Sequence, residues 1–213
     1  MARAPCQCGT AAGHTGRRVV LTGGPGAGKT AVLEVVRRYF CDHVVVLPEA
    51  AGILYAGGFP RRDSYPARRA AQLAIFHVQD QLEALALGEG VPALILCDRS
   101  ILDGIAYWPG DPESFFHAVG TTREAVFARY AAVIHLRTPT VENGYNHRNP
   151  LRIESAAEAN ALDAKLFEAW QAHPRRTVID PTQDFFDKLT QTLAAIRAEL
   201  PPCCQPQAPL HAL

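Results

Sequence analysis

The sequence has no excess of charge of either sign, because 21 lysines and arginines balance 21 aspartates and glutamates over 213 residues. It contains no apolar run of the roughly 18–20 residues that a membrane-spanning helix needs, and residues 1–16 lack the apolar core of a secretory signal. No field over the whole molecule would therefore attract nucleic acid or a membrane. We expect a cytoplasmic protein with neither partner, in which any basic site is local.

Cysteines are few: the sequence has six, and a chain of this length does not need disulfide bonds to hold its fold. We therefore expect reduced thiols. Cys6 and Cys8 with His14 near one end, and Cys203 and Cys204 near the other, would form a metal site if the two ends met. This spacing matches none of the common zinc patterns, so the favoured interpretation is flexible tails without metal.

No internal repeat is present, and the composition changes only at the ends. Residues 1–16 are rich in small side chains and residues 201–213 contain four prolines, so both segments are predicted to be flexible tails. With 48% hydrophobic residues in the chain, the remainder, 17–200, is predicted to form a single domain with one sizeable core.

Short apolar runs alternate with helical patterns through this domain. The predicted strands are Arg18–Thr22, His43–Leu47, Ala93–Cys97, Ala132–Leu136 and Thr177–Ile179. The predicted helices are Lys29–Phe40, Ala67–Leu87, Thr121–Tyr130, Ala156–Ala172 and Asp184–Leu200. This alternation predicts an α/β fold of three layers, with helices on both faces of a five-stranded parallel sheet in the order 2-3-1-4-5. Ligands bind at the carboxyl ends of such strands.

A phosphate-binding loop follows the first predicted strand. Gly23–Thr30 satisfies the pattern G-x-x-x-x-G-K-[ST] between a strand and a helix, the context that the motif requires. Its backbone N–H groups and the helix that follows would hold phosphate oxygens, while Lys29 reaches the β- and γ-phosphates and Thr30 binds Mg²⁺. A glycine-rich turn without a nucleotide is the disfavoured alternative. The predicted nucleotide-binding residues are Gly24, Pro25, Gly26, Ala27, Gly28, Lys29, Thr30 and Ala31.

Charged side chains follow the second and third strands. Glu49 would accept the proton of an attacking hydroxyl, or it caps the next helix or pairs with an arginine. Asp98 stands where a carboxylate holds the Mg²⁺ shell, and Arg99 would stabilise charge on a transferring phosphoryl group. A helix cap with a salt bridge is the alternative for this pair.

Two arginine-containing segments extend this pattern. The segment at about 138–155 is predicted to be a lid whose Arg148 and Arg152 engage phosphate, with a charged surface loop as the alternative. Arginines cluster with an aromatic residue before the predicted helix Ala67–Leu87, where they would recognise an acidic acceptor or form a solvated face. The predicted acceptor-binding residues are Glu49, Arg61, Arg62, Tyr65, Gln79, Arg99 and Asp103, with Arg68 and Arg69 nearby.

Together these motifs resemble the small P-loop kinases of the deoxynucleoside and thymidylate kinase type, over Arg17–Ile196. The matching features are Pro48-Glu49, Asp98-Arg99-Ser100 and an arginine-rich lid before a long helix, Arg148–Trp170. The resemblance implies that Glu49 is the base, that Asp98 assists magnesium, that Arg99 touches the reacting oxygen and that Arg148 and Arg152 clamp phosphate. The base-reading pattern aromatic-x-x-Gln is matched loosely by Phe76 and Gln79.

The sequence resembles still more closely a group of small AAA-type P-loop ATPases. That group combines G-G-P-G-x-G-K-T, P-E-A-A, D-R and Y-N…R-I-E motifs, and it includes proteins similar to nicotinamide riboside kinase domains. The corresponding residues here are Gly23–Thr30, Pro48–Ala51, Asp98-Arg99, Tyr145-Asn146 and Arg152–Glu154. No sensor or arginine-finger module of the ring-forming ATPases is evident.

The sequence therefore predicts an ATP- and Mg²⁺-dependent kinase with basal ATPase activity. Its partner would be a small-molecule phosphoryl acceptor, nucleoside-like or acidic, and a homodimer is compatible with the pattern. The alternative is a nucleotide-dependent regulator that acts through lid movement on a protein or lipid. A metal or redox role for the terminal cysteines is a third, less favoured interpretation. No N-K-x-D motif for guanine is evident, so the preference between ATP and GTP stays open.

Overall fold

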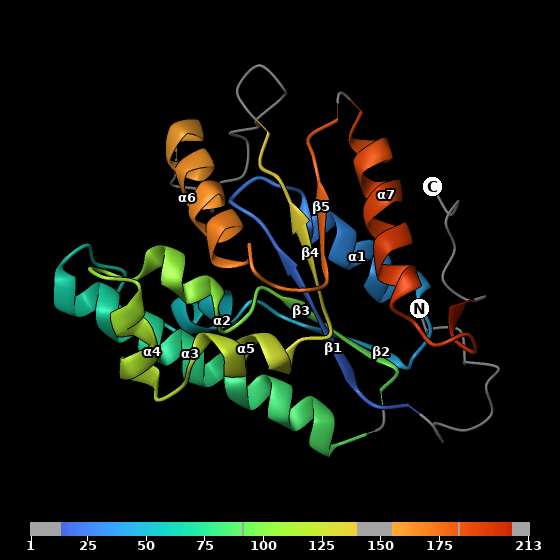
Figure 1. Ribbon diagram of the computed structural model, residues 1–213, viewed down its shortest axis with the longest axis horizontal. Coiled ribbons are helices and arrows are strands. Elements are labelled where there is room, and N and C mark those ends of the chain that lie inside the picture. The colour runs from blue at the N-terminus through green and yellow to red at the C-terminus, as the bar shows by residue number, and fades with distance from the viewer. Residues whose placement is uncertain (1–13, 91, 140–154, 183, 206–213) are drawn as a thin grey trace.

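The computed structural model describes residues 14–90, 92–139, 155–182 and 184–205. Five strands form one parallel sheet in the order β2-β3-β1-β4-β5, so the predicted strand order is confirmed (Figure 1). The strands are β1 (Arg17–Thr22), β2 (Val44–Leu47), β3 (Leu94–Asp98), β4 (Ala132–Leu136) and β5 (Arg176–Ile179). Each predicted strand end lies within one residue of the observed end, because the buried β-branched runs coincide with the ladders.

Helices cover both faces of the sheet, as Figure 1 shows, with α1 and α7 on one side and α3 to α6 on the other. The helices that were predicted are α1 (Lys29–Tyr39), α3 (Tyr65–Gly88), α5 (Arg123–Arg129), α6 (Ala156–Ala169) and α7 (Phe185–Ala198). The short elements α2 (Ala50–Ala56), η1 (Asp103–Tyr107) and α4 (Glu113–Val119) were not predicted. They span five to seven residues, too few for a helical period to show. In the described part of the chain, no helix is long and apolar enough to span a membrane.

The core has two halves because alternate residues of each strand point to opposite faces of the sheet. Val19 and Leu21 of β1 pack with Val36 of α1 and Leu193 of α7 in one half. The other half contains aromatic side chains, among them the fully buried Trp170 at the end of α6. Both faces of the central strand are therefore sealed, which leaves the carboxyl edge of the sheet as the place for a ligand.

A charged network is buried between α3 and α5. Glu83 has no exposed side-chain surface and accepts hydrogen bonds from Arg129 Nε at 2.7 Å and from the Tyr130 hydroxyl at 2.7 Å. Gln79 Nε2 donates to the same carboxylate at 3.0 Å. Burial, followed by the charge of Glu83, raises the pKa of the Tyr130 hydroxyl well above its ordinary value, so it remains a donor. This network fixes the direction of α3, which carries part of the site.

The chain ends differ from the predicted flexible tails where the structure describes them. Gly16 N–H donates to the Pro92 carbonyl at 2.9 Å, and His14 is buried. Cys204 is fully buried and belongs to the same core half as α1 and α7. The composition suggested tails, but these few residues pack on the domain because a thiol and an imidazole find partners there. Residues 1–13 and 206–213 lie outside the described residues.

We predict that Glu83→Ala destabilises the domain by roughly 1–3 kcal/mol, because it leaves the buried Tyr130 hydroxyl and the Gln79 amide without their acceptor, while Arg129 keeps its ion pair with Asp80. Denaturant unfolding followed by circular dichroism measures the free energy. The matched control is Glu89→Ala at the exposed end of α3, expected within about 0.5 kcal/mol of the unmodified protein. Equal effects of the two substitutions would show that the network does not stabilise the fold.

Candidate active site

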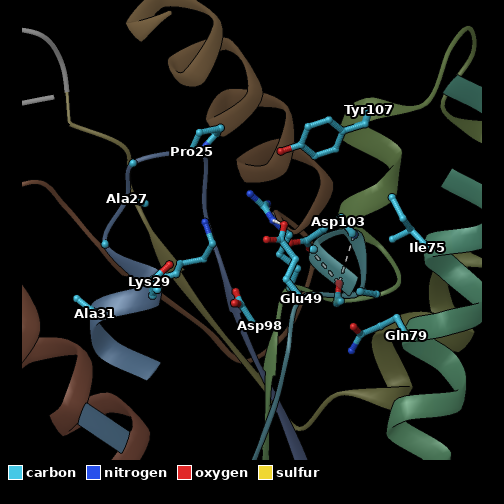
Figure 2. Close-up of a pocket in the computed structure, with 18 of the residues that line it drawn as sticks. Pro25, Ala27, Lys29, Ala31, Glu49, Ile75, Gln79, Asp98, Asp103 and Tyr107 are labelled. Carbon is cyan, nitrogen blue, oxygen red and sulfur yellow. Dashed lines mark hydrogen bonds and ion pairs between the residues drawn. The ribbon is translucent and has the colours of Figure 1, made fainter. Parts of the chain in front are cut away.

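The register of the sheet brings three loops to one edge. Leu21 lies opposite Asp98 across the β1–β3 ladder, and Leu47 lies opposite Cys97 across β2–β3. The residues that follow β1 and β2 therefore meet the end of β3. A cavity of about 1150 Å³ opens there, between the P-loop, Glu49, Asp98, the side of α3 and the start of α7 (Figure 2).

The P-loop conformation depends on glycine at its two ends. Gly23 has φ +134°, and a Cβ there would overlap the Leu136 carbonyl oxygen. Gly28, with φ +100°, is the N-cap of α1 and lies against the Phe185 ring. A left-handed N-cap lets the loop turn directly into the helix, so α1 begins at the cavity wall, where a helix N-terminus would attract an anion.

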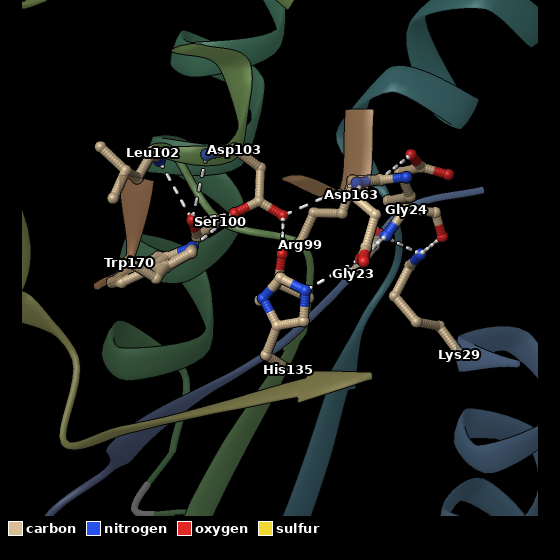
Figure 3. A network of polar contacts seen from close by, with 12 residues as sticks. Gly23, Gly24, Lys29, Arg99, Ser100, Leu102, Asp103, His135, Asp163 and Trp170 are labelled. Carbon is tan, nitrogen blue, oxygen red and sulfur yellow. Dashed lines mark hydrogen bonds and ion pairs between the residues drawn. The ribbon is translucent and has the colours of Figure 1, made fainter. Parts of the chain in front are cut away.

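Lys29 lies across the mouth of this loop. Its Nζ donates to the Gly23 carbonyl at 2.7 Å and to the Gly24 carbonyl at 3.0 Å (Figure 3). Burial, with the Arg99 charge next, lowers its pKa to about 8. The ammonium is thus held at the phosphate-binding loop, and an anion in the cavity would offset the repulsion that lowers this pKa.

Arg99 is the one described non-glycine residue with positive φ, at +66°. Its N–H extends the sheet by donating to the Leu21 carbonyl at 3.1 Å, while the left-handed turn directs its side chain back over the P-loop. Nε donates to Glu49 at 2.7 Å and Nη1 to the Gly23 carbonyl at 3.3 Å. Burial opposes its charge, but Tyr107 and the surrounding carboxylates raise its pKa further, so it stays cationic. Backbone strain of this kind is characteristic of functional sites.

Glu49 precedes α2 and faces the cavity with 39% of its side chain exposed. Burial would raise its pKa, but Arg99 and Lys29 together hold it below the ordinary value, so the carboxylate is ionised at neutral pH. Of the alternatives left open by the sequence, the ion pair with an arginine is present, and no side-chain cap bond to α2 forms. The same carboxylate remains accessible to an acceptor.

Asp98 has the surroundings of a cation ligand. Its Oδ1 is buried and has no hydrogen-bond partner among the described residues. Burial raises its pKa to about 6, with Lys29 opposing and Glu49 adding to the shift. Thr30 presents its side chain at the exposed start of α1, in the wall of the same cavity. A carboxylate and a hydroxyl are ligands that Mg²⁺ accepts, so the residues present fit the predicted metal.

Asp103 lines the cavity, but its oxygens are already engaged within the protein. It accepts hydrogen bonds from Thr22 Oγ1 at 2.6 Å, Ser100 Oγ at 3.0 Å and Trp170 Nε1 at 3.0 Å (Figure 3). Asp103 therefore supports the loop that carries Arg99, and its predicted contact with an acceptor stays a prediction. Trp170, at the far end of α6, gave no sequence signal for this contact.

The predicted acceptor arginines separate into different environments. Arg61 lines the cavity and lies over the Tyr55 ring, 5.1 Å from its centroid, whereas Arg62 and Tyr65 are exposed and do not line it. Gln79 lines the cavity and lies at its α3 side in Figure 2. Arg62 lies in the loop before α3 and Tyr65 is the first residue of that helix, and their contact with an acceptor stays a prediction.

Two further arginines near that loop support the neighbouring turn. Arg68 Nη2 donates to the Tyr107 carbonyl at 3.2 Å, and the Arg69 guanidinium lies 4.9 Å from the Trp108 ring centroid. Arg148 and Arg152, the predicted lid arginines, lie outside the described residues, as does most of 138–155.

Sequence reasoning missed the wall formed by the end of β5. Pro181 and Thr182, with Phe185 and Lys188 of α7, line the cavity beside the P-loop. Lys188 Nζ donates to the Arg137 carbonyl at 2.6 Å, and burial lowers its pKa to about 8. These residues could have been found from the sequence, because they follow the fifth strand just as the other site residues follow the first three strands. Phe185 offers a flat apolar surface next to the P-loop.

A second missed group holds the P-loop from α6. Gly24 N–H donates to Asp163 Oδ1 at 3.0 Å, and His135 Nε2 lies 2.9 Å from the same oxygen. Arg137 Nε lies 2.7 Å from Asp163 Oδ2. Burial opposes the charge on Asp163, but His135 and Gly24 hold its pKa below the ordinary value. The helix after the predicted lid is therefore tied directly to the P-loop.

Fold and site together define a P-loop nucleotide-binding domain of the small kinase and ATPase superfamily. Residues 18–188 match the family described as AAA domain, and the chain belongs to that family, as the motifs predicted. The structure is similar to that of thymidylate kinase from Candida albicans, with a TM-score of 0.56 and 15% identity, covering 86% of this chain and 91% of that chain. Among curated proteins, none matches.

We predict that Lys29→Ala lowers nucleotide turnover by roughly 10²–10³-fold, the effect of removing one donor from a phosphate site. Release of ADP from ATP with Mg²⁺ gives the rate, and circular dichroism checks the fold. Lys165→Ala, on the exposed side of α6, is the control and should keep full turnover. Unchanged turnover in Lys29→Ala would contradict the assignment of the P-loop.

Proposed function

We propose that the protein is an ATP- and Mg²⁺-dependent kinase that transfers the γ-phosphoryl group to an oxygen of a small molecule. The observation that carries this proposal is the convergence of Lys29, Glu49, Asp98 and Arg99 on one cavity, which continues past them toward α3. A site for hydrolysis alone needs room for water, whereas this cavity extends to Arg61 and Gln79. It has space for a phosphate donor and a second substrate.

In this proposal the P-loop N–H groups and Lys29 hold the β- and γ-phosphates. Phe185 stacks on the purine, which explains the apolar wall beside Gly28. Asp98 and Thr30 would hold Mg²⁺, which would neutralise charge on the phosphate oxygens when bound. Most of the rate enhancement then comes from positioning the substrates and stabilising charge, because phosphoryl transfer requires little covalent chemistry from the protein.

Glu49 accepts the proton of the acceptor hydroxyl while that oxygen bonds to the γ-phosphorus. The bond from the γ-phosphorus to the bridging oxygen breaks, and ADP leaves. Arg99 does two things during this step: it keeps Glu49 ionised and oriented through their 2.7 Å contact, and its guanidinium stabilises charge on the transferring group. A depressed pKa makes Glu49 a modest base, which suffices where it mainly orients the nucleophile.

The acceptor end of the cavity is mixed in character. Gln72 and Gln79 supply amides, Tyr55 and Tyr107 supply aromatic surface, and Arg61 supplies a positive charge. Such a combination fits a nucleoside-like acceptor or a small acidic metabolite. The likeness to a thymidylate kinase supports an acceptor that carries both a base and a phosphate.

The alternative is a nucleotide-dependent regulator, and one contact favours it. Because Gly24 N–H binds Asp163 of α6, a change at the P-loop would move the helix that follows the predicted lid. A kinase would change its ATP turnover with a small acceptor. A regulator would change it with a protein or lipid partner instead.

Glu49→Gln keeps the shape of the side chain and removes the base. We predict a fall of roughly 10²–10⁴-fold in phosphoryl transfer, with little change in ATP affinity measured by titration of a fluorescent ATP analogue. Glu168→Gln on exposed α6 is the matched control. Weaker ATP binding with an unchanged transfer rate would assign Glu49 to the metal shell or to structure.

Arg61→Ala and Arg62→Ala test the acceptor end as a pair. We predict that Arg61→Ala raises the acceptor KM by about 10–100-fold and leaves the KM for ATP unchanged. This is the effect expected when a hydrogen bond to a charged group is lost. Arg62→Ala should leave both constants unchanged. The acceptor is chosen as the best of a panel of nucleosides, nucleoside monophosphates and small carboxylates. An unaltered acceptor KM in Arg61→Ala would point to a neutral acceptor.

A further inference from the structure

A cluster of thiols and imidazoles lies at the opposite edge of the sheet from the cavity. It joins three parts of the chain: the segment before β1 with His14, the loop between α1 and β2 with Cys41 and His43, and the segment after α7 with Cys203 and Cys204. Figure 1 shows α7 running alongside α1 toward this edge. No disulfide joins any two of the cysteines that the structure describes.

The distances among His14, Cys203 and Cys204 are those of a metal coordination shell. His14 Nε2 lies 3.4 Å from Cys203 Sγ and 3.7 Å from Cys204 Sγ, and the two sulfurs are 3.9 Å apart. His43 Nδ1 lies 3.9 Å from Cys204 Sγ. Around tetrahedral zinc, with bonds of about 2.3 Å to sulfur and about 2.05 Å to nitrogen, neighbouring ligands are separated by roughly 3.8 Å for two sulfurs and roughly 3.6 Å for sulfur and nitrogen.

We propose that His14, Cys203 and Cys204 are three protein ligands of a structural zinc site. Thiolate and imidazole donors in a tetrahedral arrangement select zinc among the common divalent cations, because magnesium and calcium require oxygen. Cys204 and His14 are buried, whereas Cys203 is exposed. Cys41 and His43 form a second group of possible ligands with Cys204.

A zinc ion at this site would link the two ends of the domain. His14 and Cys203 are 189 positions apart in the sequence, so a shared ion removes much of the freedom of the unfolded chain. The cluster follows the carboxyl end of α1, whereas Lys29 begins that helix. Zinc here would therefore stabilise the fold and leave phosphoryl transfer to the other edge of the sheet.

The metal content of the full-length protein tests this proposal. After expression with zinc and dialysis against metal-free buffer, we predict about one zinc ion per chain by elemental analysis. His14→Gln and the double variant Cys203→Ser/Cys204→Ser should lose most of it. Cys97→Ser, which alters a buried cysteine of β3 outside the cluster, should retain it. Lys29→Ala should also retain it, which separates this proposal from the proposed function.

Removal of zinc with a chelator should lower the melting temperature by roughly 5–10 °C, as expected for loss of a tightly bound ion, and ATP turnover with Mg²⁺ restored should remain. Because the cysteine variants can misfold, Co²⁺ alone is the second probe on the unmodified protein. Tetrahedral thiolate ligation gives intense visible bands and a sulfur charge-transfer band. Absence of both zinc and these bands, or a disulfide between Cys203 and Cys204 in the purified protein, would overturn the proposal.

Discussion

The candidate site depends on the ladder between β1 and β3. Because Leu21 is in register with Asp98, the P-loop leaves the sheet beside the carboxylate that fits a metal. The ladder continues one residue further through the Arg99 N–H, which donates to the Leu21 carbonyl. At that residue the chain turns left-handed, so the guanidinium returns over Gly23 and Glu49. A slip of one residue would exchange the faces of the strand and separate these groups.

Charge balance follows from that geometry. Lys29 and Arg99 are buried close together, and their repulsion contributes to the lowered pKa of Lys29. Glu49 and Asp98 offset part of it, although burial favours the neutral form of Asp98. The arrangement thus leaves two cations beside the P-loop and the buried Asp98 Oδ1 without a hydrogen bond among the described residues. In the proposed function, the negative polyphosphate would balance the two cations and its metal ion would be bound by Asp98.

The strands, the long helices and the P-loop were predictable because each is a local pattern of neighbouring residues. The positions of Glu49, Asp98 and Arg99 in the site were predictable because these residues follow the ends of predicted strands. The rest needed tertiary contacts: Trp170 and Asp163 reach the site from α6, and only a folded chain brings them to Asp103 and Gly24. Arg61 and Arg62 are indistinguishable in sequence, because irregular loops have no period. The contact between His14 and Cys203 likewise depends on where β1 begins and where α7 ends in the folded chain.

Transfer of label from the γ-phosphate of ATP tests the central claim most directly. The full-length protein is incubated with γ-labelled ATP, Mg²⁺ and a panel of nucleosides, nucleoside monophosphates and small carboxylates, and the products are separated by chromatography. We predict that the label appears on an organic product with at least one class of acceptor. Label found only in inorganic phosphate with every class would contradict a kinase and favour a nucleotide-dependent regulator.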